Sequence, residues 1–473
     1  MNTGSVAYPG RPKVHRESLP PGPPELPIVG QSFRYITDQL GLLHEAAKYG
    51  DLATVSTKPT LIYLVNHPDL IRELFVTNHQ SVGRGFLTGT YRYLMGNGLV
   101  TADGPLHLRQ RRLMQPQFHH SRIAGYAAVM TDFANRHEQE WQDGQRIDVA
   151  QEMSDLTLHI VVKTLFGLDP PDTVRRIGEA FEVSNDYITI RGNQPVPLRK
   201  LLHRLPVPLT HRFKRGLAYL DETVYSLIEQ RRQSGLDGDD LLSLLLNVRD
   251  DEAENPADAV MTDQQVRDEA ITLFAAGHET TAVALTWTWY LLATHPDIQS
   301  RFQAELDEVL NGRIPTPGDI SDLPFTERVL TESMRLYPPI WSTGRMTYQP
   351  ITLGGWEIPA GAGLVAPQLL IQRDPRWFDQ PLEFRPDRWT PQFRENLPAF
   401  AYYPFGGGPR LCIGEGFARM EAILILATLG QRWTVRHDAQ HEVELMPLVS
   451  LRPKGGMPLF LERRTRAATR AAA

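Results

Sequence analysis

The chain has 473 residues, of which 41% are hydrophobic and 22% are charged, a composition typical of a globular protein with a substantial core. Its 49 basic and 55 acidic residues give a formal net charge of −6, so the overall charge does not favour nucleic acid, and we exclude a nucleic-acid partner. The single cysteine, Cys412, excludes an intramolecular disulfide and fits a reducing compartment, so we expect a cytoplasmic protein.

The N-terminal segment contains no apolar stretch long enough for a signal peptide, and far less the ~20 residues of a membrane span, so we expect no transmembrane anchor. Residues 1–18 predict a flexible arm. The proline cluster of residues 19–27 predicts an extended entry into one large domain, which we place at residues 19–462. Residues 463–473, rich in Arg and Ala, predict a flexible tail.

The first half of the domain predicts a little β structure followed mostly by helices. A helix is expected over residues 38–49, then a hairpin with strands at residues 52–55 and 61–65. Further helices are expected to begin at Pro68, to contain residues 107–114 and to cover residues 211–233. Residues 191–211 mix basic and apolar side chains that would suit an anionic membrane surface, but we favour a solvated loop. The acidic segment 250–258 is likewise interpreted as a solvated connection.

A helix of roughly 30 residues is predicted from Thr262 to about His295, because residues 262–265 have a capping-box pattern that an apolar stretch follows. Two more helices, at residues 296–312 and 324–337, begin at prolines. Short alternating runs at residues 345–367 predict a small sheet. The pattern as a whole predicts a mainly α fold with a minor β region.

The most informative segment is residues 405–414, Phe-Gly-Gly-Gly-Pro-Arg-Leu-Cys-Ile-Gly, which precedes an apolar helix expected over residues 415–429. Three consecutive glycines permit a close approach of the backbone to a flat macrocycle. Cys412 stands just before the helix N-terminus, where unpaired amides and the helix dipole stabilise a thiolate and lower its pKa. A lone cysteine is usually inert and buried, but these neighbours favour a ligand role.

Phe405, Gly408, Arg410, Cys412 and Gly414 stand at the spacing of the proximal loop of the cytochrome P-450 superfamily, and the sequence resembles a soluble, bacterial-type haem-thiolate monooxygenase. The resemblance implies that family's single-domain fold and haem b as cofactor, with Cys412 as the axial iron ligand that favours O–O cleavage. It also implies that Phe405 packs near the sulfur, that Gly414 belongs to the haem-binding loop and that Arg410 pairs with a haem propionate.

A second matching segment is Ala276-Gly277-His278-Glu279-Thr280-Thr281 in the long helix, which resembles the family's oxygen-activation sequence. The resemblance implies that Ala276 and Gly277 leave room for dioxygen and that Thr280 hydrogen-bonds it. Glu279 would relay protons as a general acid, if necessary through water.

Three further matches concern haem and the fold around it. His107 and Arg111, four apart on one helical face, and Arg345 match the family's propionate ligands. Glu332 and Arg335, three apart, match the family's Glu-x-x-Arg pair and are assigned with Arg388 to a buried structural network. The segment of Arg388 departs from the family's commonest pattern by carrying Asp387 for Glu and Trp389 for Phe.

Several assignments rest on family topology alone. Arg109 and Arg112 either face an acidic electron donor or are solvated surface charges, and Arg84 or Arg92 either anchors a substrate carboxylate or lies at the surface. The substrate pocket is expected to be apolar and to include Phe86, Leu87, Tyr91, Leu94, Met95, Phe274, Ala275, Trp341, Ser342, Thr343, Leu448 and Val449.

The expected reaction inserts one atom of dioxygen into a small apolar substrate, such as a fatty acid or a terpenoid, and reduces the other atom to water. Only 61 residues follow Cys412 (473 − 412), too few for a fused flavin reductase. We therefore expect a monomer that receives electrons from NAD(P)H through a separate ferredoxin and its reductase, or through a flavoprotein. The alternatives are a peroxide-driven peroxygenase or non-redox haem isomerase, and a haem-based sensor or carrier. The Glu279-Thr280 pair argues against all of them, because none needs a proton relay.

Overall fold

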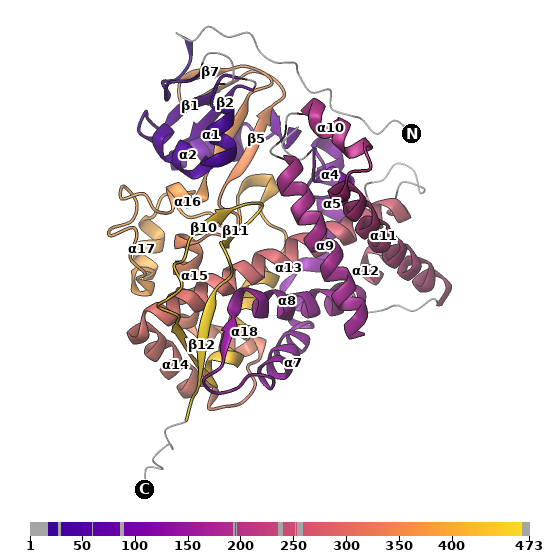
Figure 1. The fold of residues 1–473 in the computed structure, drawn as a ribbon, viewed down its shortest axis with the longest axis vertical. Helices are drawn as coiled ribbons and strands as arrows, with labels where there is room; N and C mark the ends of the chain where they lie inside the picture. The colour runs from indigo at the N-terminus through magenta and orange to yellow at the C-terminus, as the bar shows by residue number, and fades with distance from the viewer. Residues whose placement is uncertain are drawn as a thin grey trace.

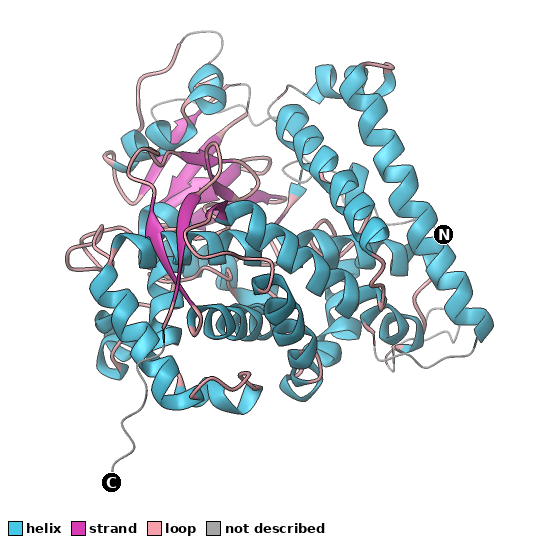
Figure 2. Cartoon of the chain, turned by 60° about the horizontal axis from the view of Figure 1, so that its bottom comes forward, coloured by secondary structure: helices cyan, strands magenta, loops and turns pink. Residues whose placement is uncertain are grey.

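The computed structural model describes residues 18–26, 30–58, 60–85, 89–192, 194, 196–234, 240–250, 252 and 259–465. Within them the chain forms one large, mainly helical domain with a smaller β region, as predicted. The strands gather at one side of the molecule and helices make up the rest (Figure 2). Nearly all of the predicted arm and residues 466–473 of the predicted tail lie outside the described residues, and no described helix is long and apolar enough to cross a membrane.

The β region joins segments that are far apart in the sequence. The predicted hairpin is present as β1 (Leu52–Ser56) and β2 (Ile62–Val65), which pair antiparallel. β2 then pairs in parallel with β8 (Gly363–Ala366), and the sheet continues through β5 (Thr343–Thr347) to β3 (Val82–Gly83). α1 (Ser32–Thr37) and α2 (Gln39–Ala47) lie beside this sheet in Figure 1. The sheet therefore joins strands from the first quarter of the chain, β1 to β3, to two strands that precede Cys412, β5 and β8.

Three smaller sheets complete the strands. β4 (Arg146–Asp148), β12 (Pro458–Arg463) and β9 (Trp433–His437) form one sheet, with β12 in the middle. β6 (Ile351–Leu353) pairs with β7 (Trp356–Ile358), and β10 (Leu445–Pro447) pairs with β11 (Leu451–Pro453). The short turn between β10 and β11 reaches the functional site.

Helices form the body of the molecule (Figure 1). Those not treated separately are α3 (Pro68–Arg72), α4 (Arg92–Met95), α5 (Gly104–Met114), α6 (His120–Ala124), α7 (Ala127–Glu138), α8 (Val149–Phe166), α9 (Pro171–Gly192), α11 (Pro208–Ser234), α12 (Leu241–Asn247), α14 (Pro296–Leu310), α15 (Pro324–Leu336), α16 (Gln368–Ile371), α17 (Pro391–Asn396) and α18 (Glu415–Gly430). A π-helical turn, Glu73–Thr77, extends α3.

The long predicted helix is α13 (Asp263–Thr294), 32 residues that begin at the predicted capping box of Thr262 and Gln265. One hydrophobic core surrounds its C-terminal half and includes α7, α14, α15 and α18. A second core surrounds its N-terminal half and includes α9, α11 and α12. α13 therefore passes through the whole domain, and the residues between its two halves face the functional site.

The interpretation of residues 191–211 as a solvated loop is wrong, and that of residues 250–258 as a solvated connection is wrong at Asp250; the rest of that segment lies outside the described residues except Glu252, which is exposed. Residues 191–211 are mostly helical, because α10 (Val196–Arg204) lies between the end of α9 and the start of α11, and Arg199 is buried. Asp250 is also buried rather than solvated, because it pairs with Arg109 at 3.1 Å and with Arg112 at 2.8 Å on α5. In both cases a polar side chain that the sequence predicts to be solvated is buried, because it bonds to a side chain more than 100 positions away.

Candidate functional site

The cysteine loop, residues 405–414, leads into the N-terminus of α18. Gly406 and Gly408 have φ values of +75° and +66°, a region that side chains other than hydrogen disfavour. A Cβ atom at Gly408 would also lie 2.2 Å from the carbonyl oxygen of Phe75. The backbone N–H of Cys412 donates to the Phe405 carbonyl at 2.9 Å and closes the loop. The glycines therefore let the loop pack on a distant segment while Cys412 is presented on its inner side.

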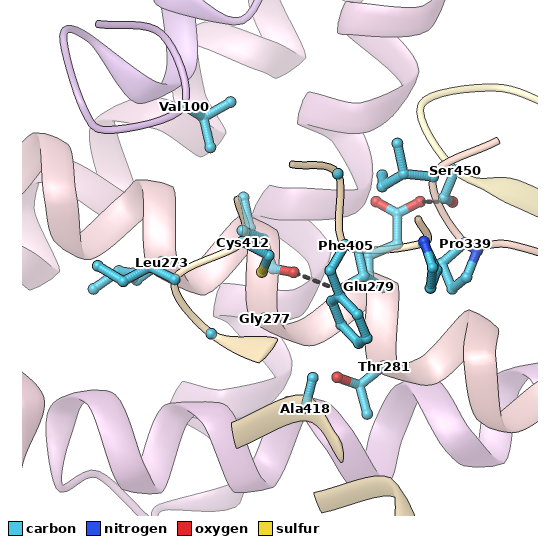
Figure 3. A pocket seen from close by; sticks show the side chains of 18 of the residues that line it. Val100, Leu273, Gly277, Glu279, Thr281, Pro339, Phe405, Cys412, Ala418 and Ser450 are labelled. Atoms are coloured by element: carbon cyan, nitrogen blue, oxygen red, sulfur yellow. Dashed lines mark hydrogen bonds between the residues drawn. The ribbon is translucent and has the colours of Figure 1, made fainter. Parts of the chain in front are cut away.

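A cavity of about 570 Å³ lies between the cysteine loop and the middle of α13. Figure 3 shows Cys412 and Phe405 next to Gly277 and Glu279 of α13 in this space. The volume is that of a small-molecule site, and most of the wall is apolar. Cys412 is accessible to solvent from this cavity although it lies within the fold.

The environment of Cys412 differs from the expectation in one respect. Burial raises the pKa of the Cys412 thiol, whereas the backbone N–H of Gly414 and the charge of Arg111 lower it only in part. The helix N-terminus therefore does not outweigh burial, and the predicted low pKa of a free thiol is wrong. A coordinating metal ion deprotonates a thiol outright, so the side chain suits a metal ligand better than an unassisted nucleophile.

The α13 segment opposite the loop presents small and polar residues to the cavity. Ala276, Gly277 and Thr280 all line it. A Cβ atom at Gly277 would meet only Val161, at 3.6 Å, so packing against the protein does not itself require glycine there. The hydroxyl of Thr280 donates to the Ala276 carbonyl at 2.6 Å, one turn earlier in the helix. It can accept a hydrogen bond in this position, but it must rotate away from that carbonyl to donate one to a molecule in the cavity.

Glu279 is held by three donors from two other parts of the chain. Ser450 donates to Oε1 at 2.5 Å, and Arg452 donates to the same oxygen through Nε at 2.8 Å. Asn185 of α9 donates to Oε2 at 2.8 Å. These partners lie 94 to 173 positions away in the sequence, which is why the α13 motif alone did not reveal them. The arrangement stabilises an anionic carboxylate.

Basic groups gather at the β-region side of the cavity. His107, Arg111, Arg345 and Arg410 all line it, as does Arg84. Burial, together with the charges of the nearby arginines, lowers the pKa of His107 to about 3, so its imidazole is neutral at pH 7. Arg345 is buried, and no described carboxylate pairs with it; its guanidinium lies 4.5 Å from the centre of the Phe75 ring.

Three of these groups already have protein partners; among the described residues, Arg345 has only the carbonyl of its neighbour Gly344, at 2.9 Å. Arg410, expected to pair with a propionate, forms an ion pair with Asp103 and donates to the Ala102 carbonyl at 3.0 Å. Arg111 donates to the Leu411 carbonyl at 2.6 Å, beside Cys412. Both contacts of Arg410 use Nη2, and Arg410 lines the cavity, so its Nε and Nη1 groups remain for the expected propionate.

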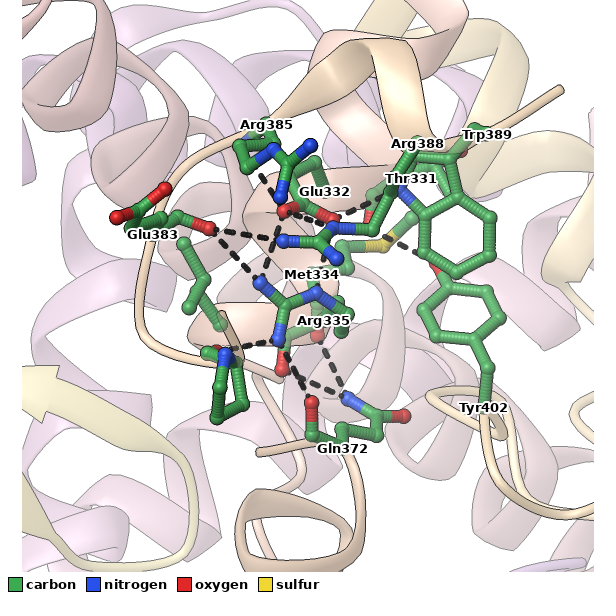
Figure 4. A network of polar contacts seen from close by, with 12 residues as sticks. Thr331, Glu332, Met334, Arg335, Gln372, Glu383, Arg385, Arg388, Trp389 and Tyr402 are labelled. Carbon is green, nitrogen blue, oxygen red and sulfur yellow. Dashed lines mark hydrogen bonds and ion pairs between the residues drawn. The ribbon is translucent and has the colours of Figure 1, made fainter. Parts of the chain in front are cut away.

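The predicted structural network lies outside the cavity and is fully buried (Figure 4). Glu332 accepts from Arg335 Nε and Nη2, each at 2.8 Å, and from Arg388 Nε at 2.8 Å. Trp389 Nε1 also donates to Glu332 at 2.8 Å. The departure of Trp389 from the commonest motif thus supplies an additional hydrogen bond. Asp387, the other departure, is exposed and pairs with Arg301.

The predicted substrate pocket is correct in part. Cavity-lining residues are Tyr91, Met95, Ala275, Trp341, Ser342, Thr343, Leu448 and Val449. Leu94 and Phe274 do not line it, because both are completely buried in the core; Phe274 stacks on Phe181 at a centroid distance of 3.9 Å. Phe86 and Leu87 lie outside the described residues.

Some lining residues were not predicted because no local motif identifies them. They are apolar side chains contributed by separate elements: Leu99, Val100, Val161, Leu165, Leu241 and Ile340. Arg92 does not serve as the suggested carboxylate anchor, because it donates to the Thr101 carbonyl at 2.9 Å and does not line the cavity. Arg109 and Arg112 pair with Asp250, so they are not free surface charges.

Comparisons with known proteins agree with this geometry. The family model described as Cytochrome P450 matches residues 20–460. Cyclooctatin synthase of Streptomyces melanosporofaciens is 36% identical over 92% of this chain and 94% of its own length. Pentalenene oxygenase of Streptomyces avermitilis is 33% identical over 94% of this chain and 97% of its own.

A third relative, cyclooctat-9-en-7-ol 5-monooxygenase of Streptomyces melanosporofaciens, is 35% identical over 88% of this chain and 89% of its own. Among solved structures, the haem domain of cytochrome P450DA superposes with a TM-score of 0.84 at 26% identity. That alignment covers 94% of this chain and 98% of the haem domain. The likeness therefore extends over the whole domain and not only over its motifs.

Proposed function

Because the chain belongs to the cytochrome P450 family of monooxygenases, we propose that it inserts one oxygen atom from dioxygen into a terpenoid-like substrate held above Cys412. The observation that carries the proposal is that Cys412 and Thr280 line the same apolar cavity from opposite elements. A thiol ligand on one side and a hydroxyl on the other leave room for a flat group between them.

The residues present fit a haem group. Arg345 is a buried cation without a carboxylate partner among the described residues, and Arg84 has a buried Nε atom without a hydrogen-bond partner. Unpaired buried cations are costly, and propionates would compensate them. We assign Cys412 as the iron ligand, Arg84 and Arg345 as propionate ligands, and Phe405 and Gly414 as the contacts around the sulfur. His107, Arg111 and Arg410, which line the same cavity, complete the proposed set of propionate ligands.

When bound, haem would supply the activation of dioxygen at its iron, to which a thiolate ligand contributes electron density. Thr280 then donates its hydroxyl proton into the cavity after releasing the Ala276 carbonyl. Glu279 takes up protons from solvent at the side of Arg452, whose side chain is 34% exposed, and passes them toward Thr280. Ala276 and Gly277 keep the space beside Thr280 free of larger side chains.

The wall of the cavity favours a terpenoid over a fatty acid. Arg84, Arg345 and Arg410 belong to the cationic group near Asp103. Arg111 contacts the cysteine loop, and Arg419 stacks on Phe405 at 4.9 Å. No arginine or lysine in the described lining therefore remains on the substrate side to bind a carboxylate. Three relatives are named for oxygenation or synthesis of cyclic terpenoids, which supports the same substrate class.

Electrons are proposed to come from NAD(P)H through a separate ferredoxin and its reductase, or through a flavoprotein. The cysteine loop reaches the surface at Leu411, which is 38% exposed, and Leu108 of α5 is 55% exposed. Arg111 donates a hydrogen bond to the Leu411 carbonyl and so lies beside these two leucines. An exposed apolar patch with a basic group at its edge would suit the binding of an acidic electron-transfer protein. The single cysteine supports a reducing, cytoplasmic setting.

The test is turnover of cyclic terpene hydrocarbons with a surrogate ferredoxin, its reductase, NADPH and isotopically labelled dioxygen. We expect a product that carries one labelled oxygen atom. Thr280→Ala should keep oxidising NADPH while forming peroxide instead of product, and Thr280→Ser, which retains the hydroxyl, should restore coupling. Product formation from peroxide alone at the same rate, or no oxygen consumption beyond autoxidation, would refute the proposal.

A further inference from the structure

Asp103 occupies the N-cap position of α5, but its side chain does not cap that helix. An N-cap aspartate ordinarily accepts a hydrogen bond from the first turn of its own helix. Asp38, Asp148 and Asp240 do so in α2, α8 and α12. The carboxylate of Asp103 therefore serves a different purpose.

Its partners come from three separate segments. The backbone N–H of Arg84 donates to Asp103 at 2.9 Å, and the hydroxyl of Tyr348 donates at 2.6 Å. The guanidinium of Arg410 forms an ion pair with it. Asp103 is buried, so these charged and polar contacts are shielded from water. One carboxylate thus ties the segment before residue 86, the strand region after β5 and the cysteine loop together.

The same carboxylate lies within a group of three arginines. Burial lowers the pKa of Arg84 to about 10 and also lowers the pKa of Arg345 and Arg410, while the charge of Asp103 raises all three. With Arg111, which lines the same cavity, four guanidinium groups face one carboxylate, and His107 adds no charge because its pKa is about 3. The site therefore carries an excess of positive charge, which favours the two propionates of haem b.

We propose that Asp103 is a positioning residue of the haem site, which fixes Arg410 beside Cys412 and sets the net charge of the propionate pocket. The inference rests on the proposed function, because it requires haem in the cavity. Asp103 accepts from Nη2 of Arg410 and leaves Nε and Nη1 of that side chain, together with Arg84 and Arg345, for the propionates. Arg410 precedes Cys412 by two positions, so the carboxylate also orients the loop that carries the thiol.

The charge of Asp103 should be measurable at the metal. Loss of a negative charge from a buried site leaves an uncompensated positive charge, which favours the less positive, reduced state of iron. Asp103→Asn keeps the size of the side chain and removes its charge. We expect a more positive reduction potential. Loss of the charge-assisted hydrogen bond between Asp103 and Arg410 also frees the loop that carries Cys412, so transfer of haem to excess apomyoglobin should be on the order of tenfold faster.

The decisive variant combines Asp103→Asn with Arg410→Gln, which removes one charge of each sign. If charge balance is the role of Asp103, the double variant should recover much of the wild-type potential and haem content. Asp148→Asn is the matched control, because Asp148 caps α8, accepts from the Met457 N–H at 2.7 Å and does not line the cavity. It should lower thermal stability without changing the potential.

Three results separate the possibilities. Absence of a thiolate-type carbon monoxide spectrum in the wild-type protein would refute the proposed function itself. A normal wild-type spectrum together with an unchanged potential and unchanged haem transfer in Asp103→Asn would overturn only the role of Asp103. If Asp103→Asn fails to accumulate, additive damage in the double variant, rather than recovery, would also overturn it.

Discussion

The buried carboxylate of Glu332 offers a quantitative prediction about stability. It accepts hydrogen bonds from Arg335, Arg388 and Trp389, and from the backbone N–H of Arg385 at 3.0 Å. Glu332 and Arg335 are 0% exposed, and Arg388 is nearly so. Glu332→Gln preserves the shape of the side chain but leaves two guanidinium groups buried without a counter-charge. Removal of one partner of a buried ion pair costs about 3–5 kcal/mol.

Urea unfolding followed by circular dichroism measures this cost, with the haem content of each preparation determined in parallel. Asp387→Asn is the matched control, because Asp387 belongs to the same segment as Arg388 but forms an exposed pair with Arg301 at 2.7 Å. An exposed pair contributes only about 0–1 kcal/mol. If Glu332→Gln reduces the free energy of unfolding no more than Asp387→Asn, the assignment of Glu332 as the centre of a buried structural network is incorrect.

Three further predictions address the proton path, a buried acid and the cysteine loop. Glu279→Gln should slow product formation about 10²-fold as expected for a general acid, and an unchanged rate would remove Glu279 from proton delivery. Burial raises the pKa of Glu269 to about 8 from its usual 4.5, so this group should lower the stability of the wild-type protein as the pH rises from about 4.5 to 8. Glu421 has a similarly raised pKa, so Glu269→Gln should reduce that fall in thermal unfolding scans without abolishing it, and an identical pH profile would contradict the prediction. Gly408→Ala should prevent haem incorporation, because the added methyl group would collide with the Phe75 backbone. Gly355 has a similar positive φ but open space around it, so Gly355→Ala should lower the free energy of unfolding by only about 1–2 kcal/mol. Equal haem content in both variants would show that the contact with Phe75 is unimportant.

Local sequence signals predicted much of the helical framework. The capping box at Thr262 fixes the start of α13 because its two hydrogen bonds lie within four residues. Glu332 and Arg335 meet because they are three positions apart on one helix. The hairpin of β1 and β2 follows from short strands around a turn. Each of these features depends on neighbours along the chain.

The remaining features depend on contacts that local patterns cannot specify. The parallel pairing of β2 with β8 joins residues about 300 positions apart, and the partners of Glu279 come from α9 and from the β10–β11 turn. Family topology placed Phe274 in the pocket, but the aromatic stack with Phe181 turns it into the core. The contacts of Asp103 were missed for a related reason, since its position before a helix gives an ordinary explanation for an aspartate.

The central claim is that Cys412 binds haem iron as a thiolate. The most direct measurement is the optical spectrum of the purified, reduced protein under carbon monoxide, recorded for the wild-type chain and for Cys412→Ser. We predict a strongly red-shifted Soret band in the wild-type protein that is lost in the variant. A protein that takes up no haem, or a band in the unshifted position typical of a nitrogen ligand, would contradict the account.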